Sequence, residues 1–141
     1  MRVLGFNFTK ISIEKLENSN EKLNITTNVE FSSIEKAGSG PLELKEDVIV
    51  VGFTYFINYE PNFAKVEFKG NILLYMEPKQ TKEMLKSWKD KQISDDTRIF
   101  LFNVILNKAN VKAIQLEDEL NLPFHLPMPR LSKQNKENKI N

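Results

Sequence analysis

The chain has 141 residues, with 20 basic and 19 acidic side chains and no cysteine. This length predicts one domain, and the absence of cysteine excludes disulfides, zinc–thiolate sites and thiol catalysis. A net charge of +1, with arginine only at Arg2, Arg98 and Arg130, gives no reason to expect nucleic acid as a partner. No segment has the pattern of a signal peptide or a membrane span, so we expect a cytoplasmic protein without membrane insertion.

The first two predicted elements are strands. Within Val3–Glu14 the apolar residues fall in two phases, Leu4, Phe6 and Phe8 before Ile11 and Ile13. This change of phase predicts a β-bulge near Thr9–Lys10. Leu23–Ile34 alternates apolar with polar residues, which is typical of a strand with one face in water.

The most regular pattern is Val48–Met76, two runs of period-two alternation joined at Glu60-Pro61-Asn62. Alternation predicts strands, and Pro-Asn between them is turn chemistry. We therefore predict a long antiparallel hairpin that completes a four-stranded, mainly antiparallel sheet. The first of these two runs is apolar on both faces, because apolar residues also occupy its even-numbered positions: Val48, Val50 and Phe56. Such a strand needs cover on both sides, from a helix on one and from another subunit on the other.

Helices follow the hairpin. Pro78 ends the last strand, and Lys79–Lys91 predicts an amphipathic helix. Ser94 is the expected N-cap of a second helix, which is apolar nearly all round and should be buried on several sides. We expect Asn107–Asn110 to break or kink this helix before a last helical stretch at Val111–Leu120.

The C-terminal part of the domain is rich in proline. Leu122–Leu131 contains three prolines and should lie extended along the folded body. Residues 132–141 are polar and are expected to be a disordered tail. The sequence thus predicts one α+β domain over residues 1–131: a four-stranded mainly antiparallel sheet, then packed helices and a proline-rich extended C-terminal segment.

Catalytic and metal-binding patterns are weak. His125 is the single histidine, and a lone histidine in an apolar run is more often structural. Glu117, Asp118 and Glu119 are consecutive, so on a helix they point in different directions and predict a solvated acidic patch, not a metal cage. No nucleotide-binding or nucleophile motif occurs. We therefore expect no enzyme activity, no cofactor and no metal.

Aromatic residues are more numerous in the hairpin and the short helix than an ordinary core requires, and they indicate a function. They occupy both phases of the hairpin and the short helix: Phe53, Tyr55, Phe56, Tyr59, Phe63, Phe68, Tyr75 and Trp88. Ordinary core explains more than half of them. The rest predicts an apolar surface that is covered by a partner or available for binding. By phase we assign Tyr55, Phe56, Tyr75, Met84 and Trp88 to this exposed surface, as candidate contacts for a bound polypeptide.

The order of elements resembles the SecB family of export chaperones. Phe8–Glu14 (FTKISIE) is similar to the family's first-strand pattern, in which an aromatic residue, Thr and Lys precede Ser, an aromatic residue and Glu. Ala64–Phe68 before Gly70 is similar to its fourth strand. Arg98 stands about where the family has an arginine at a helix start. Asn121–Pro123 is similar to its Leu-Asn-Leu-x-Pro connection.

The resemblance covers roughly Phe6 to Leu131, although the family's long final helix is missing and Val111–Leu120 looks inserted. It implies an ATP-independent holdase that binds non-native polypeptides, with a role in protein export or translocation, assembled as a dimer or tetramer. Glu14 and Glu67 match the family's carboxylates that contact the translocation machinery, which implies a partner-binding role for both. Two alternatives stay open: a carrier of a small apolar ligand in an aromatic-lined cavity, and a structural subunit of an oligomer.

Overall fold

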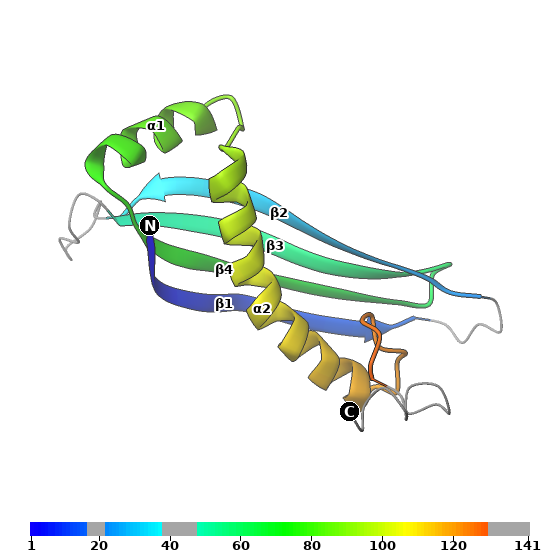
Figure 1. The fold of residues 1–141 in the computed structure, drawn as a ribbon. Coiled ribbons are helices and arrows are strands. Elements are labelled where there is room, and N and C mark those ends of the chain that lie inside the picture. The colour runs from blue at the N-terminus through cyan, green and yellow to red at the C-terminus, as the bar shows by residue number, and fades with distance from the viewer. Residues whose placement is uncertain (17–21, 38–47, 130–141) are drawn as a thin grey trace, which may run out of the picture.

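The structure of the chain, a computed structural model, describes residues 1–16, 22–37 and 48–129. These residues form strands β1 (Arg2–Lys15), β2 (Asn24–Lys36), β3 (Val48–Glu60) and β4 (Ala64–Tyr75), and then helices α1 (Pro78–Trp88) and α2 (Asp95–Glu119). The strands make one antiparallel sheet in the order β1-β4-β3-β2 (Figure 1). Neither of these helices is long and apolar enough to cross a membrane. The α+β architecture matches the prediction.

The β3–β4 hairpin pairs along its whole length, from Val48 opposite Tyr75 to Tyr59 opposite Ala64. Asn62 in the turn has a φ of 46°, in the left-handed region that asparagine tolerates. The Phe63 N–H donates to the Tyr59 carbonyl at 2.9 Å and closes the turn. The predicted hairpin is therefore confirmed.

Strand β1 carries the predicted bulge. The pairing of β1 with β4 shifts register between Phe8 and Lys10, and a second shift lies between Val3 and Gly5. An extra residue reverses the side-chain alternation. Consequently Phe6 and Phe8 before the bulge and Ile13 after it all pack against the same core.

Helix α2 crosses one face of the sheet obliquely (Figure 1). Every second residue of β3 from Ile49 to Tyr59 points to this face and is at most 1% exposed. Helix α2 packs on this face with one fully buried residue per turn: Leu101, Ile105, Ala109 and Ala113. An i, i+4 spacing of this kind forms one stripe along a helix.

The predicted break at Asn107–Asn110 is wrong, because α2 runs continuously from Asp95 to Glu119. Asparagine costs only a few tenths of a kcal/mol more than average residues in a helix, at most about 0.7 kcal/mol relative to alanine. Burial of the stripe on either side of the asparagines exceeds that cost, since tertiary packing supplies most of the stability of a protein helix.

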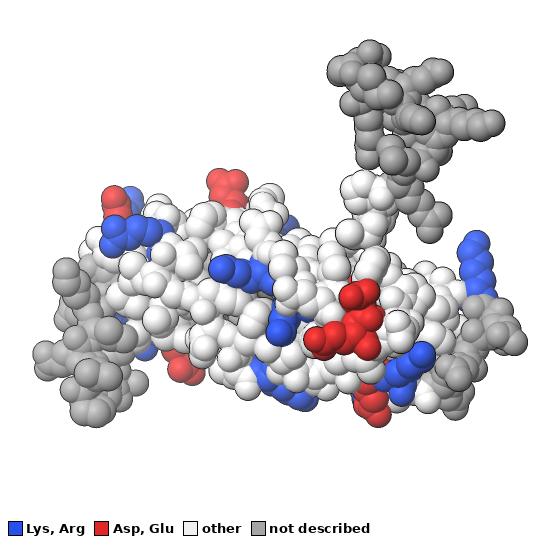
Figure 2. Space-filling view, turned by 90° about the horizontal axis from the view of Figure 1, so that it is seen from below, with Lys and Arg blue, Asp and Glu red and all other residues white. Residues whose placement is uncertain are grey.

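The opposite face of the sheet carries no described helix. Val50, Phe56 and Tyr75 are half-buried there. Helix cover was thus predicted correctly for one side of β3, and cover by another subunit remains a prediction. Figure 2 shows the side that is lowest in Figure 1, where β1 forms the edge: blue and red residues are scattered over a largely white surface.

The proline-rich segment packs on the body only in its first part. Leu122 is 5% exposed, whereas Leu126 is 38% and Met128 47% exposed. The expected strip is therefore correct up to His125 and wrong for the two apolar residues beyond it. Arg130 and the predicted tail lie outside the described residues.

Candidate functional site

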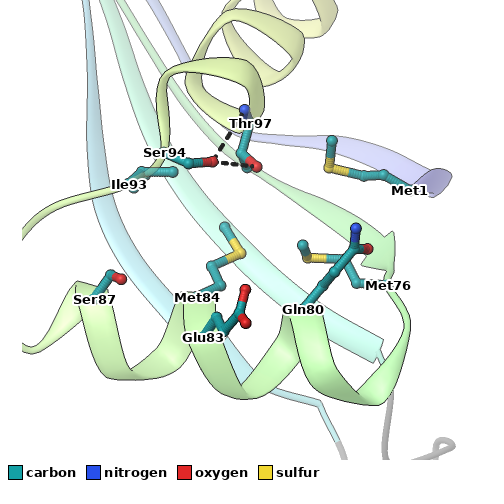
Figure 3. Close-up of a pocket in the computed structure, with 9 residues that line it drawn as sticks. All are labelled: Met1, Met76, Gln80, Glu83, Met84, Ser87, Ile93, Ser94 and Thr97. Atoms are coloured by element: carbon teal, nitrogen blue, oxygen red, sulfur yellow. Dashed lines mark hydrogen bonds between the residues drawn. The ribbon is translucent and has the colours of Figure 1, made fainter.

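A first hollow lies where α1 crosses the end of the sheet, and we call it the methionine pocket. It has a volume of about 210 Å3 and is lined by Met1, Met76, Gln80, Glu83, Met84, Ser87, Ile93, Ser94 and Thr97. Figure 3 shows its three methionine side chains, which come from the N-terminus, the end of β4 and α1. Methionine is flexible and polarizable, so such a wall adapts to differently shaped apolar groups.

A second hollow, the tryptophan pocket, has a volume of about 330 Å3. Its lining residues are Phe31, Trp88, Lys91, Gln92, Ile93, Asp95 and Arg98. Phe31, on edge strand β2, stacks on Phe102 of α2 with ring centres 5.1 Å apart. Because Ile93 lines both hollows, they are adjacent, and we refer to the two together as the α1–α2 groove.

The start of α2 forms a fixed wall of this groove. The Thr97 N–H donates to Ser94 Oγ at 3.4 Å, and the Ser94 hydroxyl donates to Thr97 Oγ1 at 2.9 Å (Figure 3). Asp95 and Asp96 occupy the first turn, where the helix dipole favours negative charge. The predicted N-cap is confirmed, and it places Ser94 and Thr97 in the methionine pocket.

The five residues assigned to an exposed binding surface do not lie together. Tyr55 is fully buried and Met84 is 6% exposed, so the predicted exposure of these two is wrong. Tyr55 has the same phase as the other β3 residues beneath α2, and its ring stacks on Phe68 at 5.4 Å. Met84 turns inward and forms a wall of the methionine pocket.

The other three residues are half-buried and lie in two places. Trp88 lines the tryptophan pocket. Phe56 and Tyr75 are out of phase with the buried residues of β3 and β4, so they lie on the open face of the sheet. The structure thus brings Met84 and Trp88 to one groove and separates them from Phe56 and Tyr75.

Glu14 and Glu67, the predicted partner contacts, lie near each other on β1 and β4. Glu14 pairs with Lys65 at 3.8 Å, and Glu67 lies 3.4 Å from Lys10 and 3.7 Å from Lys69. The two glutamate side chains remain 55% and 36% exposed. Exposed pairs of this kind contribute at most about 1 kcal/mol, so a cationic partner could replace the lysines. The partner-binding role stays a prediction.

A buried polar cluster that the sequence did not predict joins the end of α2 to the hairpin. Glu117 is 0% exposed, so its assignment to a solvated acidic patch is wrong. Its carboxylate accepts from the Tyr59 hydroxyl at 2.8 Å and lies 2.8 Å from His125 Nδ1. Asn110 Oδ1 accepts from the Tyr55 hydroxyl at 2.8 Å and lies 3.0 Å from His125 Nε2.

His125 Nδ1 contacts the Glu117 carboxylate, and Nε2 contacts Asn110 Oδ1 and, at 3.2 Å, the Tyr55 hydroxyl, so both ring nitrogens have polar partners. No buried side-chain polar atom among the described residues lacks a partner. Burial, followed by the charge of Glu117, raises the pKa of Tyr55. Burial, the hydrogen bond to Glu117 and the charge of Glu117 raise the pKa of Tyr59. Both hydroxyls therefore stay protonated as donors.

This cluster is enclosed, because the side chains of His125 and Glu117 are 1% and 0% exposed. The His125 backbone N–H also donates to Glu117 Oε1 at 3.3 Å, and the Tyr59 hydroxyl lies 2.6 Å from the Pro123 carbonyl. These contacts fasten the segment after α2 to β3. The structural role expected for His125 agrees with this geometry. A signal for Glu117 did exist, since it continues the buried i, i+4 stripe four residues after Ala113.

No family model and no curated protein sequence matches this chain. A solved structure that is similar is the Mycobacterium tuberculosis Rv1957 SecB-like chaperone in complex with a ChAD peptide from the Rv1956 HigA1 antitoxin. The similarity has a TM-score of 0.57 at 14% sequence identity and covers 93% of this chain and 89% of that chain. The predicted fold is therefore confirmed: this protein has a SecB-like fold.

Proposed function

We propose that this protein is an ATP-independent holdase that binds non-native polypeptides in the α1–α2 groove. The observation that carries the proposal is the pair of adjacent hollows at Ile93, lined by methionine and aromatic side chains. The fold shared with a SecB-like chaperone that was solved with a bound peptide supports a polypeptide as the ligand class.

The groove can supply enough affinity for this role. Burying one large apolar side chain contributes about 2 kcal/mol, so a few contacts reach the roughly 8 kcal/mol of a micromolar complex once association costs are included. Phe31 of the tryptophan pocket belongs to β2, which is an edge strand of the sheet. The free backbone groups of an edge strand can pair with an extended polypeptide whatever its sequence. Holding unfolded chains requires recognition of this sequence-independent kind.

Export or translocation is the setting that we propose for this activity, with Glu14 and Glu67 as contacts for the translocation machinery. Their partial exposure on neighbouring strands supports a role in binding a cationic surface. We further propose a homo-oligomer, a dimer or tetramer, because the half-buried apolar residues of the open sheet face lack a described covering element. A stable monomer in sedimentation at micromolar concentration would contradict the oligomer.

The small-ligand carrier has less support. It required an aromatic-lined cavity between sheet and helix. The aromatic residues of β3 and β4 beneath α2 are instead at most 1% exposed, and Tyr55 of β3 stacks on Phe68 of β4. The two hollows lie instead beside α1, and the smaller one is below the roughly 300 Å3 typical of small-molecule sites. Their dimensions suit individual side chains of a longer ligand.

A light-scattering assay tests the holdase proposal. The purified protein, without ATP, is mixed with a heat-labile client at increasing molar ratio, and aggregation should fall as the ratio rises. Ile93→Ser places a hydroxyl where the two hollows meet and should weaken protection. Ile99→Ser is the matched control, because Ile99 is 55% exposed on α2 and lines neither hollow. Absence of protection at several-fold molar excess of folded protein would refute the proposal.

A further inference from the structure

Lys91 occupies a backbone position where glycine is the usual residue. Its φ is 57°, in the left-handed region. The Lys91 N–H donates to the Trp88 carbonyl at 2.8 Å and the Gln92 N–H to the Ser87 carbonyl at 3.1 Å, which is the bond pair of a Schellman helix ending. Residues with a Cβ are disfavoured in this conformation, so ending the helix does not explain a lysine here.

The Lys91 ammonium is positioned at the tryptophan pocket. Its Nζ lies 4.5 Å from the centre of the Trp88 ring, and the residue lines the hollow. The two other charged residues of the lining, Asp95 and Arg98, pair with each other at 2.8 Å. Lys91 forms no ion pair with any carboxylate of the described residues. The pocket therefore presents one unpaired positive charge beside an aromatic wall.

A lysine near the end of a helix can also serve the helix dipole. In α1 this role is filled by Lys86, which lies in the last turn. The dipole interaction does not require a side chain that lies over Trp88, and it does not require the left-handed backbone of Lys91. The position of the ammonium at the pocket thus favours a role toward a ligand.

We infer that the tryptophan pocket selects a large apolar side chain that has an acidic residue two positions away in the bound polypeptide. The inference rests on the proposed function and specifies its client. The apolar side chain packs against Trp88 and Phe31, and the carboxylate pairs with Lys91 Nζ. Residues two positions apart in an extended chain point to the same side, so one segment can make both contacts.

Three labelled peptides without tryptophan test this inference with the full chain, by fluorescence anisotropy. Each has the same Leu-Phe-Leu centre and is flanked by Asp, Asn or Lys. We expect the Asp-flanked peptide to bind about fivefold more tightly than the Asn-flanked one at low salt, which is the size of an exposed ion pair reinforced by an apolar neighbour. This advantage should fall below about twofold at 0.5 M salt, because salt screens exposed charges. The Lys-flanked peptide should bind most weakly.

Two substitutions assign the preference to Lys91. Lys91→Gln removes the charge and keeps a long side chain on the same backbone, and Lys91→Gly removes the side chain at a φ that suits glycine, so it should fold at least as well. Either one should reduce the Asp-over-Asn preference below about twofold and leave the Asn-flanked affinity nearly unchanged, because only the charge contact is lost. Lys82→Gln is the control, since Lys82 is exposed on α1 and lines neither hollow.

The possible results separate this inference from the function on which it rests. Equal binding of all three peptides, tighter binding of the Lys-flanked peptide, or an unchanged preference in Lys91→Gln would overturn the inference and leave the holdase proposal standing. If none of the peptides binds to the folded protein, the proposed function fails, and the inference fails with it.

Discussion

Glu117→Ala should be among the most destabilising single changes in this chain. The carboxylate is fully buried and lies 2.8 Å from both the Tyr59 hydroxyl oxygen and His125 Nδ1. Its removal leaves His125 Nδ1 and the His125 backbone N–H without their partner, and leaves the Tyr59 hydroxyl with the Pro123 carbonyl alone. Each buried polar group left without its partner costs about 1–3 kcal/mol, so the combined loss is a large part of the roughly 5–15 kcal/mol that stabilises a domain.

Glu117→Gln separates shape from charge. Glutamine has the same size but replaces one acceptor oxygen with a donor, so one of the two bonds is lost, at a cost of about 1–3 kcal/mol. Glu119→Ala is the control, because Glu119 is exposed at the end of the same helix and forms no side-chain bond among the described residues. It should change stability by less than about 0.5 kcal/mol.

Urea unfolding followed by far-UV circular dichroism measures all three variants, and the shift of the midpoint at constant slope gives the change in the free energy of unfolding. The expected order of loss is Glu117→Ala, then Glu117→Gln, then Glu119→Ala. If Glu117→Ala loses less than about 1 kcal/mol at an unchanged slope, the cluster does not anchor the C-terminal segment and the reasoning is refuted.

Two further predictions concern the sheet. Gly70→Ala should lower the free energy of unfolding by about 1–3 kcal/mol, since the added Cβ would collide with the Asn7 carbonyl oxygen on β1. Gly5→Ala is the control and should be tolerated, because its added Cβ would meet the Leu73 side chain at an ordinary 3.4 Å. Equal melting temperatures of the two variants would contradict this prediction. Tyr55 and Tyr59 hold raised pKa values when folded, so their contribution to stability is complete below pH 10 and is lost as pH rises above it. The urea midpoint should therefore fall as the pH is raised from 8 to 11. The tyrosinate absorbance of Tyr55 and Tyr59 should appear only when the protein unfolds.

Local patterns predicted the strands and the turn between the last two. Alternation located the hairpin within one residue at each end, and Pro61-Asn62 marked its turn. The change of phase in the first strand located the bulge, and Ser94 located the start of α2. These features depend on neighbouring residues along the chain, so sequence alone contains the information.

The errors arose where contacts between residues distant in the sequence determine the structure. Asn107–Asn110 suggested a helix break, but packing of α2 on the sheet keeps the helix intact. Tyr55 and Glu117 were expected at the surface, yet both are buried between β3 and α2. The Tyr55 hydroxyl donates to Asn110 of α2, and the Glu117 carboxylate accepts from Tyr59 of β3. Which residues face across the core depends on how α2 crosses the sheet, and no local pattern specifies that crossing. The spacing of Glu117 after Ala113 could have indicated its burial but not its partners.

Trp88 offers the most direct test of the central claim, because it is the single tryptophan of the chain and lines the proposed client groove. A permanently unfolded client without tryptophan can be titrated into the protein while Trp88 emission is recorded, with client binding measured in parallel by anisotropy of a label. The holdase proposal predicts that both signals saturate together at micromolar client, and that Ile93→Ser weakens both. Client binding that leaves Trp88 emission unchanged, or no binding at all, would contradict it.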